Sequence, residues 1–91
     1  MPPPDTLARP ESVEVAPGIF KTPGVCGGRA CVDSFRIPVW LLEGYRQLGA
    51  TDADLLRNYP SLTAEHLVHA AAYVVANRAE IEADIRENDE A

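Results

Sequence analysis

The chain has 91 residues, of which 46% are hydrophobic and 24% are charged, and its formal net charge is −6. This length supports one small core of limited stability, which self-association would supplement. No segment has the length and apolarity of a transmembrane helix, and Met1–Pro4 lack the basic and apolar regions of a signal peptide. We therefore expect a cytoplasmic protein that has no membrane partner.

The negative charge lies at the two ends of the chain. Residues 1–15 contain three acids and one base, residues 16–79 five acids and six bases, and residues 80–91 six acids and one base. The central body is therefore close to neutral, and nearly all of its bases are arginines, which suit directed contacts. A strongly basic surface, typical of generic nucleic-acid binding, is not predicted.

The N-terminal half favours loops and short strands. Residues 1–16 are rich in proline and have no apolar period, so we expect a flexible arm, followed by a single domain over 17–87 and an acidic, frayed tail over 88–91. Within the domain, Ile19–Lys21 and Cys31–Val32 are predicted as two short extended pieces. So short a strand pair needs a partner, either the helices or the same hairpin of a second subunit.

The central part of the chain predicts two helices. Apolar residues at helical spacing indicate a first helix over Pro38–Leu48. Gly44 lies inside this helix, which usually signals close packing against another backbone. Thr51 and Asp54 have the spacing of a capping box and predict a short second helix at about Asp52–Asn58.

The C-terminal part predicts a third helix and a break. Thr63 is a suitable N-cap, so the third helix should begin at Ala64. An unbroken helix would bring Arg78 onto the apolar face, and we therefore expect a kink or break near Asn77. Beyond the break, an amphipathic helix is predicted over Ala79–Glu87.

Together these elements predict a mainly α fold, a homeodomain-like helix-turn-helix bundle of three to four helices with a short N-terminal β-hairpin or strand region. The second helix of such a motif lies in the major groove of DNA. Glutamate can accept from cytosine and histidine can donate to purine acceptors, although neither is the common arginine-to-guanine contact. The candidate DNA-binding residues are Arg57, Thr63, Glu65, His66 and His69.

The same histidines allow a metal hypothesis, which we consider the weaker one. His66 and His69 are three residues apart on one helix face, and Glu65 or Cys31 could join them, but no second ligand pair has a recognisable spacing. We therefore predict no metal and no cofactor, and interpret Cys26 and Cys31 as packed or partly exposed thiols. The chain has no nucleophile elbow or phosphate loop, so we predict that it is not an enzyme.

Two sequence blocks carry a resemblance to a known family. Arg36-Ile37-Pro38-Val39 and Tyr59-Pro60-Ser61-Leu62-Thr63 resemble the signature of the family catalogued as domain of unknown function 433, over about residues 17–85. The resemblance implies a short strand region before a homeodomain-like helical bundle, commonly dimeric. It also implies a VapB-like antitoxin, often encoded beside a PIN-like ribonuclease toxin.

The segment before the first helix departs from the family pattern. Ala30, Ser34 and Phe35 stand where the family usually has Pro, Gly and Thr, which could alter a partner surface. Arg29, Phe35 and Arg36 are the candidate partner-binding residues. For Arg36 we favour the alternative that it holds its own loop or pairs with Asp33.

These features lead to one function hypothesis and one rival. The hypothesis is a DNA-binding antitoxin of a type II toxin-antitoxin system, which binds its operator as a homodimer or higher oligomer, autoregulates its operon and neutralises a PIN-like ribonuclease with a flexible end. The rival is a protein-interaction or assembly module that is built on the same fold and binds no DNA. The net charge and the few bases of the third helix favour the rival.

Overall fold

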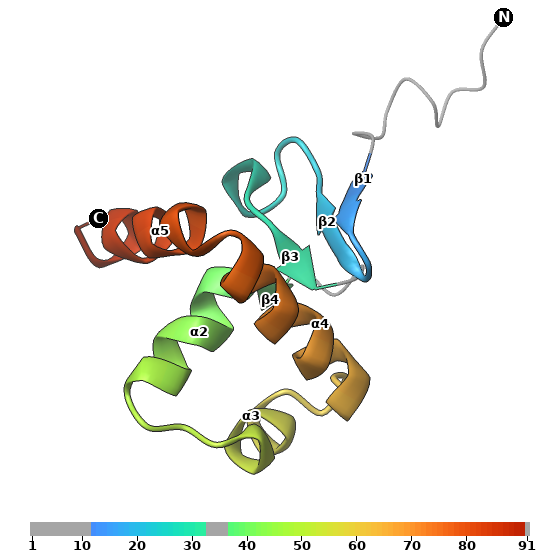
Figure 1. Ribbon diagram of the computed structural model, residues 1–91, viewed down its shortest axis with the longest axis vertical. Coiled ribbons are helices and arrows are strands. Elements are labelled where there is room, and N and C mark those ends of the chain that lie inside the picture. Colours follow the sequence, from blue (N-terminus) through green and yellow to red (C-terminus); the bar gives the residue numbers. More distant parts are fainter. Residues whose placement is uncertain (1–11, 33–36, 91) are drawn as a thin grey trace, which may run out of the picture.

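The computed structural model describes residues 12–32 and 37–90, which form an α+β fold (Figure 1). Four short strands form one antiparallel sheet in the order β1-β2-β3-β4, so the prediction of a mainly α, homeodomain-like bundle is wrong. The elements are β1 (Val13–Ala16), β2 (Ile19–Lys21), the 3-10 turn η1 (Cys26–Gly28), β3 (Cys31–Val32), β4 (Ile37–Pro38), α2 (Val39–Gln47), α3 (Asp52–Asn58), α4 (Ala64–Ala76) and α5 (Arg78–Glu90).

The sheet contains the two predicted extended pieces and two further strands. β2 and β3 coincide with Ile19–Lys21 and Cys31–Val32 and pair antiparallel, with Phe20 opposite Cys31. β1 lies within the segment that we predicted as a flexible arm, of which residues 1–11 lie outside the described residues. β4 pairs with β3, and the chain passes from it directly into α2.

Capping interactions determine where the helices begin. The prediction of α3 is confirmed, and its N-cap Thr51 forms a complete capping box with Asp54. The predicted start of α4 at Ala64 is also confirmed, with Thr63 as N-cap. α2 is one residue shorter at each end than predicted, because Pro38 belongs to β4 and serves as the N-cap.

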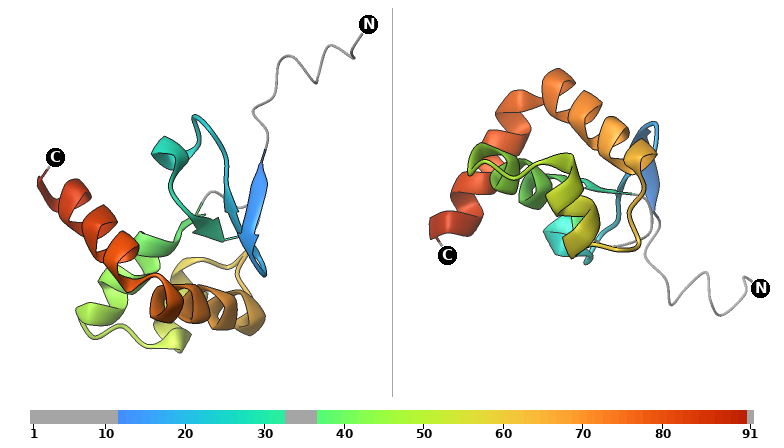
Figure 2. Two further views of the ribbon diagram at one scale, coloured as in Figure 1. Left: turned by 45° about the horizontal axis from the view of Figure 1, so that its top comes forward. Right: turned by 90° about the horizontal axis from the view of Figure 1, so that it is seen from below.

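A break at Asn77 separates the last two helices, as the sequence predicts. The backbone of this residue leaves the helical region, with φ −135° and ψ 42°, and its N–H and side-chain amide both donate to the carbonyl of Tyr73. α5 then runs at an angle to α4 and packs along α2 (Figure 2). It is longer than the predicted Ala79–Glu87 and includes Asn88–Glu90 of the segment predicted as a frayed tail.

The core lies between the sheet, α2 and α4. Its fully buried side chains come from every layer and include Ile19, Val32, Val39, Leu42, Leu55 and Ile81. Ala30, one of the departures from the family pattern, is also fully buried, and its carbonyl accepts from the first N–H of α2 at 3.0 Å. Within the described part of the chain, no helix is long and apolar enough to span a membrane.

Two glycines differ in their surroundings. Gly18 in the β1–β2 turn has φ +72°, and a Cβ placed there would collide with the imidazole of His69. The prediction that Gly44 packs closely against another backbone is wrong, since a Cβ at this position would meet no atom within 4 Å. Gly44 therefore lies at an open position on α2.

We expect alanine substitutions at these two glycines to change stability in opposite directions. Gly18→Ala should lower the free energy of unfolding by at least ~1 kcal/mol, because of its left-handed backbone and the contact with His69. Gly44→Ala should raise it by about 1 kcal/mol through helix propensity alone. Urea denaturation measures both, and a loss of stability in Gly44→Ala would contradict the described surroundings of α2.

Candidate functional site

The first turn of α4 uses two of the predicted DNA-binding residues for its own cap. The Thr63 N–H donates to Nδ1 of His66 at 2.9 Å, and the His66 N–H donates to Oγ1 of Thr63 at 3.4 Å. The histidine therefore takes the place that a glutamate usually occupies in a capping box. Neither side chain is free to reach a base edge without opening the cap.

His69 is half-buried and lies against the sheet. Its ring packs against Gly18 in the β1–β2 turn, and its Nδ1 is buried without a hydrogen-bond partner among the described residues. The contact between His69 and Gly18 joins α4 to the β1–β2 hairpin. We therefore assign His69 a packing role.

The remaining two predicted DNA-binding residues lie at the surface. Arg57 is 71% exposed, but its guanidinium pairs with Asp54 in the same helix. Glu65 is exposed in the first turn of α4, where its charge complements the positive end of the helix. The structure therefore does not bring the five predicted residues together into one basic or polar reading surface.

The bases of the described segments are used mainly within the chain. Lys21, Arg29, Arg46, Arg57 and Arg78 each lie within 4 Å of a carboxylate of the same chain. An operator-binding surface needs arginines or lysines that are free to contact phosphates. The candidate helix-turn-helix, α3 and α4, presents only Arg57.

Arg29, predicted as a partner-binding residue, instead joins the loop before β3 to α5. Its Nη2 donates to Glu87 at 2.8 Å, and its Nε lies 3.5 Å from Asp84 without the alignment of a hydrogen bond. The other two candidates, Phe35 and Arg36, lie outside the described residues, as does Asp33, the proposed partner of Arg36.

A second ion pair holds the start of α5 against the sheet. Lys21 of β2 lies 3.1 Å from Glu80, whose carboxylate also accepts from the Tyr73 hydroxyl at 2.9 Å. Burial and the neighbouring carboxylate raise the pKa of Tyr73, and the hydrogen bond to Glu80 raises the pKa of Lys21. α5, although strongly acidic, is thus fixed at two points, to the sheet by Lys21 and to the loop before β3 by Arg29.

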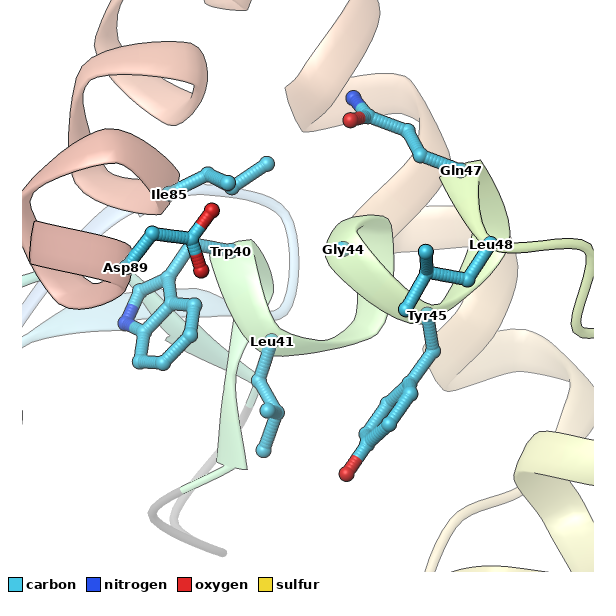
Figure 3. Close-up of a pocket in the computed structure, with 8 residues that line it drawn as sticks. All are labelled: Trp40, Leu41, Gly44, Tyr45, Gln47, Leu48, Ile85 and Asp89. Carbon is cyan, nitrogen blue, oxygen red and sulfur yellow. The ribbon is translucent and has the colours of Figure 1, made fainter.

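An open groove lies between α2 and α5, and we call it the α2–α5 groove. It has a volume of about 330 Å³ and is lined by Trp40, Leu41, Gly44, Tyr45, Gln47 and Leu48 of α2 and by Ile85 and Asp89 of α5 (Figure 3). Leu48 is 85% exposed and Tyr45 is 42% exposed. This groove offers apolar surface beside a carboxylate, Asp89.

Polar contacts at one end of the groove hold its two walls together. Gln47 donates to Glu82 of α5 at 2.8 Å and to Glu43 of its own helix at 3.2 Å. Arg78 lies 3.8 Å from Glu43 and 3.6 Å from Glu82, so it bridges the same two helices. These contacts connect α2 and α5 at this end of the groove.

Sequence reasoning did not identify the groove. The run Trp40-Leu41-Leu42 contained a signal, because three consecutive apolar residues cannot all face one side of a helix. Of these three residues only Leu42 is buried in the core, and Trp40 and Leu41 line the groove.

The two cysteines are free thiols, of which Cys31 is buried. Burial, assisted by contact with Cys26, raises the pKa of the Cys31 thiol to about 12, so it is an unreactive group at neutral pH. Cys26 is half-buried, and neither cysteine forms a disulfide. In residues 12–32 and 37–90, no three histidine, cysteine or acidic side chains are grouped so that they could hold a metal ion.

Comparisons with known proteins agree with the resemblance of the two sequence blocks. The model of the family described as Protein of unknown function (DUF433) matches residues 19–74, which run from β2 into α4. The crystal structure of a DUF433 member protein from Anabaena variabilis is similar, with 52% sequence identity and a TM-score of 0.74, over 76% of this chain and 68% of that chain. No curated protein sequence matches significantly.

Asp84 makes the attachment of α5 dependent on pH. Burial raises the pKa of this carboxyl, and Glu80 and Glu87 act in the same direction, whereas Arg29 and Lys21 oppose them. The folded protein therefore retains the proton at pH values where the unfolded chain, with a pKa near ~4, has lost it. As a result, the contribution of Asp84 to stability falls as the pH rises from about 4 through the folded pKa.

We expect Asp84→Asn to gain stability relative to the unmodified chain as the pH rises from about 4 through the folded-state pKa of Asp84, because the variant has no carboxyl to ionise. Urea denaturation at several pH values measures the difference. Asp54→Asn is the matched control with the opposite sign, since hydrogen bonds from Thr51 lower the pKa of Asp54 and its contribution is lost as the pH falls. Parallel pH profiles for the two variants would contradict this assignment.

Proposed function

The chain belongs to the DUF433 family of proteins of unknown function, and we propose that it is an antitoxin-like protein-binding module whose α2–α5 groove holds a basic, partly apolar segment of a partner protein. The observation that carries the proposal is the position of the groove between exposed apolar side chains of α2 and an acidic helix. α5 contains six acids and two bases. A partner segment with apolar and basic side chains would match both walls.

The exposed side chains of the groove can supply useful binding energy. Burying one large apolar side chain contributes about 1.5–3 kcal/mol, and Leu48 and Tyr45 are both available for burial. Asp89 lines the same groove and forms no ion pair with any side chain in the described ranges, so it can accept a cation of the partner. Gly44 leaves room between the two walls for a side chain to enter.

The charge of the groove favours a nuclease as the partner. A protein that binds RNA presents lysines and arginines to the phosphates, and such a surface complements α5. A PIN-like ribonuclease toxin, the partner that the family resemblance suggests, belongs to this class. Occupation of its basic surface by this chain would compete with RNA and so neutralise the enzyme.

The protein encoded by the neighbouring gene is the partner to test. Calorimetry measures its binding to this chain, and a ribonuclease assay measures whether binding inhibits it. We expect a complex in which the nuclease is inhibited, and Leu48→Glu should weaken binding at least tenfold because it places a charge in the groove. Val68→Glu, on the outer face of α4, is the matched control and should bind normally. Absence of a complex, or equal affinity of the two variants, would contradict the proposal.

Operator DNA is the second candidate ligand, and the capped helix pair α3 and α4 favours it because it has the outline of a helix-turn-helix. Anisotropy with the DNA upstream of the gene, compared with a random duplex at several salt concentrations, tests it. If α4 enters the major groove, Arg57→Ala should weaken binding and reduce the salt slope by about 1. Equal, weak binding to both duplexes would exclude this candidate.

A further inference from the structure

The turn η1 brings the two cysteines of the chain together. Directly after this turn, the backbone N–H of Arg29 donates to the carbonyl of Cys26 at 3.2 Å, so the chain folds back on itself there. Cys31 follows in β3, where its thiol donates to the carbonyl of Arg29 at 3.5 Å and contacts the thiol of Cys26. The two thiols therefore form a pair within one turn and the strand that follows it.

The two members of this pair differ in accessibility and in backbone conformation. Cys31 is 5% exposed and lies in a strand that is paired on both sides. Cys26 is half-buried, and with φ 52° it is the one non-glycine residue of the described segments that has a positive φ. L-residues rarely take this conformation, and such positions are concentrated at functional sites. Because Cys26 is the more accessible thiol, a reagent from solution reaches it first.

We propose that Cys26 and Cys31 are a redox-active dithiol, which closes to an intramolecular disulfide by exchange with a small disulfide such as oxidised glutathione. The thiolate of Cys26 attacks the glutathione disulfide, forms a mixed disulfide and releases one glutathione. The thiolate of Cys31 then attacks the sulfur of Cys26 and releases the second glutathione. The pair loses two electrons and two protons, and the reagent is reduced to two glutathione thiols.

Burial of Cys31 makes the second step slow but does not prevent it. Contact with Cys26 contributes to the raised pKa of Cys31, and this contribution ends when Cys26 enters the mixed disulfide. The attacked sulfur is already in place, so a high effective concentration offsets the small thiolate fraction. A thiol of high pKa is also the stronger nucleophile once it is deprotonated.

Closure of the disulfide moves the η1 turn. An S–S bond is about 2 Å long, shorter than a contact between two thiols, and the sheet holds Cys31 in place. A Cβ at Gly24 or Gly28 would meet no atom within 4 Å, so the turn has room to move. Gly27, at its centre, lies against the guanidinium of Arg29, where a Cβ would collide with Nη1.

The same arginine connects the turn to α5. Its Nη2 donates to Glu87, and its Nε lies beside Asp84. A shift of Gly27 displaces this guanidinium, so closure of the disulfide weakens the attachment of the second half of α5. The redox state of the pair thus controls how firmly this helix is held, whatever binds in the α2–α5 groove.

Mass spectrometry of the full chain, equilibrated with reduced and oxidised glutathione, tests the pair. Trypsin cuts after Arg29, so in a digest without reductant residues 22–29 and 30–36 stay together only if a disulfide joins them. We expect these linked peptides in the parent chain. Cys31→Ser should accumulate about tenfold more mixed disulfide at Cys26 than the parent chain, whereas Cys26→Ser should stay unmodified.

Two outcomes overturn the proposed dithiol. One is the absence of linked peptides at every glutathione ratio, and the other is modification of Cys31 in Cys26→Ser at the rate seen for Cys26 in the parent chain. Circular dichroism checks that the variants fold, and Cys31→Ala replaces Cys31→Ser if the buried hydroxyl prevents folding.

Hydrogen exchange tests the connection to α5. We expect the amides of residues 84–90 to exchange at least ~threefold faster in the disulfide form than in the dithiol form, because their attachment is weakened. The amides of α3 are the internal control and should not change. In Arg29→Gln the two forms should exchange equally fast at α5, because the connection is absent. Equal exchange of α5 in the two forms of the parent chain overturns this part of the proposal.

Discussion

The break between α4 and α5 is the constraint on which the arrangement of this protein depends. At Asn77 the side-chain amide and the backbone N–H both return to the carbonyl of Tyr73, which ends α4 and allows α5 to change direction. Ile81 then reaches the core, and Ile85 reaches the edge of α2. One continuous helix would carry both isoleucines away from α2 and leave no groove.

The ion pairs of the chain explain why protein binding is a better proposal than DNA binding. Arg29 and Lys21 neutralise carboxylates that attach α5 to the sheet, and Arg78 bridges α5 and α2. These bases stabilise the fold and are not available to phosphates. Asp89, near the end of α5, forms no such ion pair within the described residues and remains available to a cation.

Local features of this protein were predictable from its sequence, and contacts between distant segments were not. The start of α3 depends on Thr51 and Asp54, and the start of α4 on Thr63, because capping requires only neighbouring residues. β1 and β4 were missed because strands of two to four residues are stabilised by pairing and not by their own pattern. The position of His69 could not be predicted for a similar reason, since its packing against the β1–β2 turn depends on the tertiary fold. The α2–α5 groove likewise forms only when α5 turns back onto α2.

The position of Trp40 has an optical consequence. It is the only tryptophan of the chain and it lines the α2–α5 groove beside Ile85 and Asp89 (Figure 3). Because there is one tryptophan, the tryptophan emission of the protein comes from one wall of this groove. The indole is only partly buried, so its surroundings can change when a ligand binds. A tryptophan-free ligand that excludes water there would shift this emission to shorter wavelengths, whereas an event on the outer face of α4 would leave the spectrum unchanged. Intrinsic fluorescence therefore separates the two surfaces without any label.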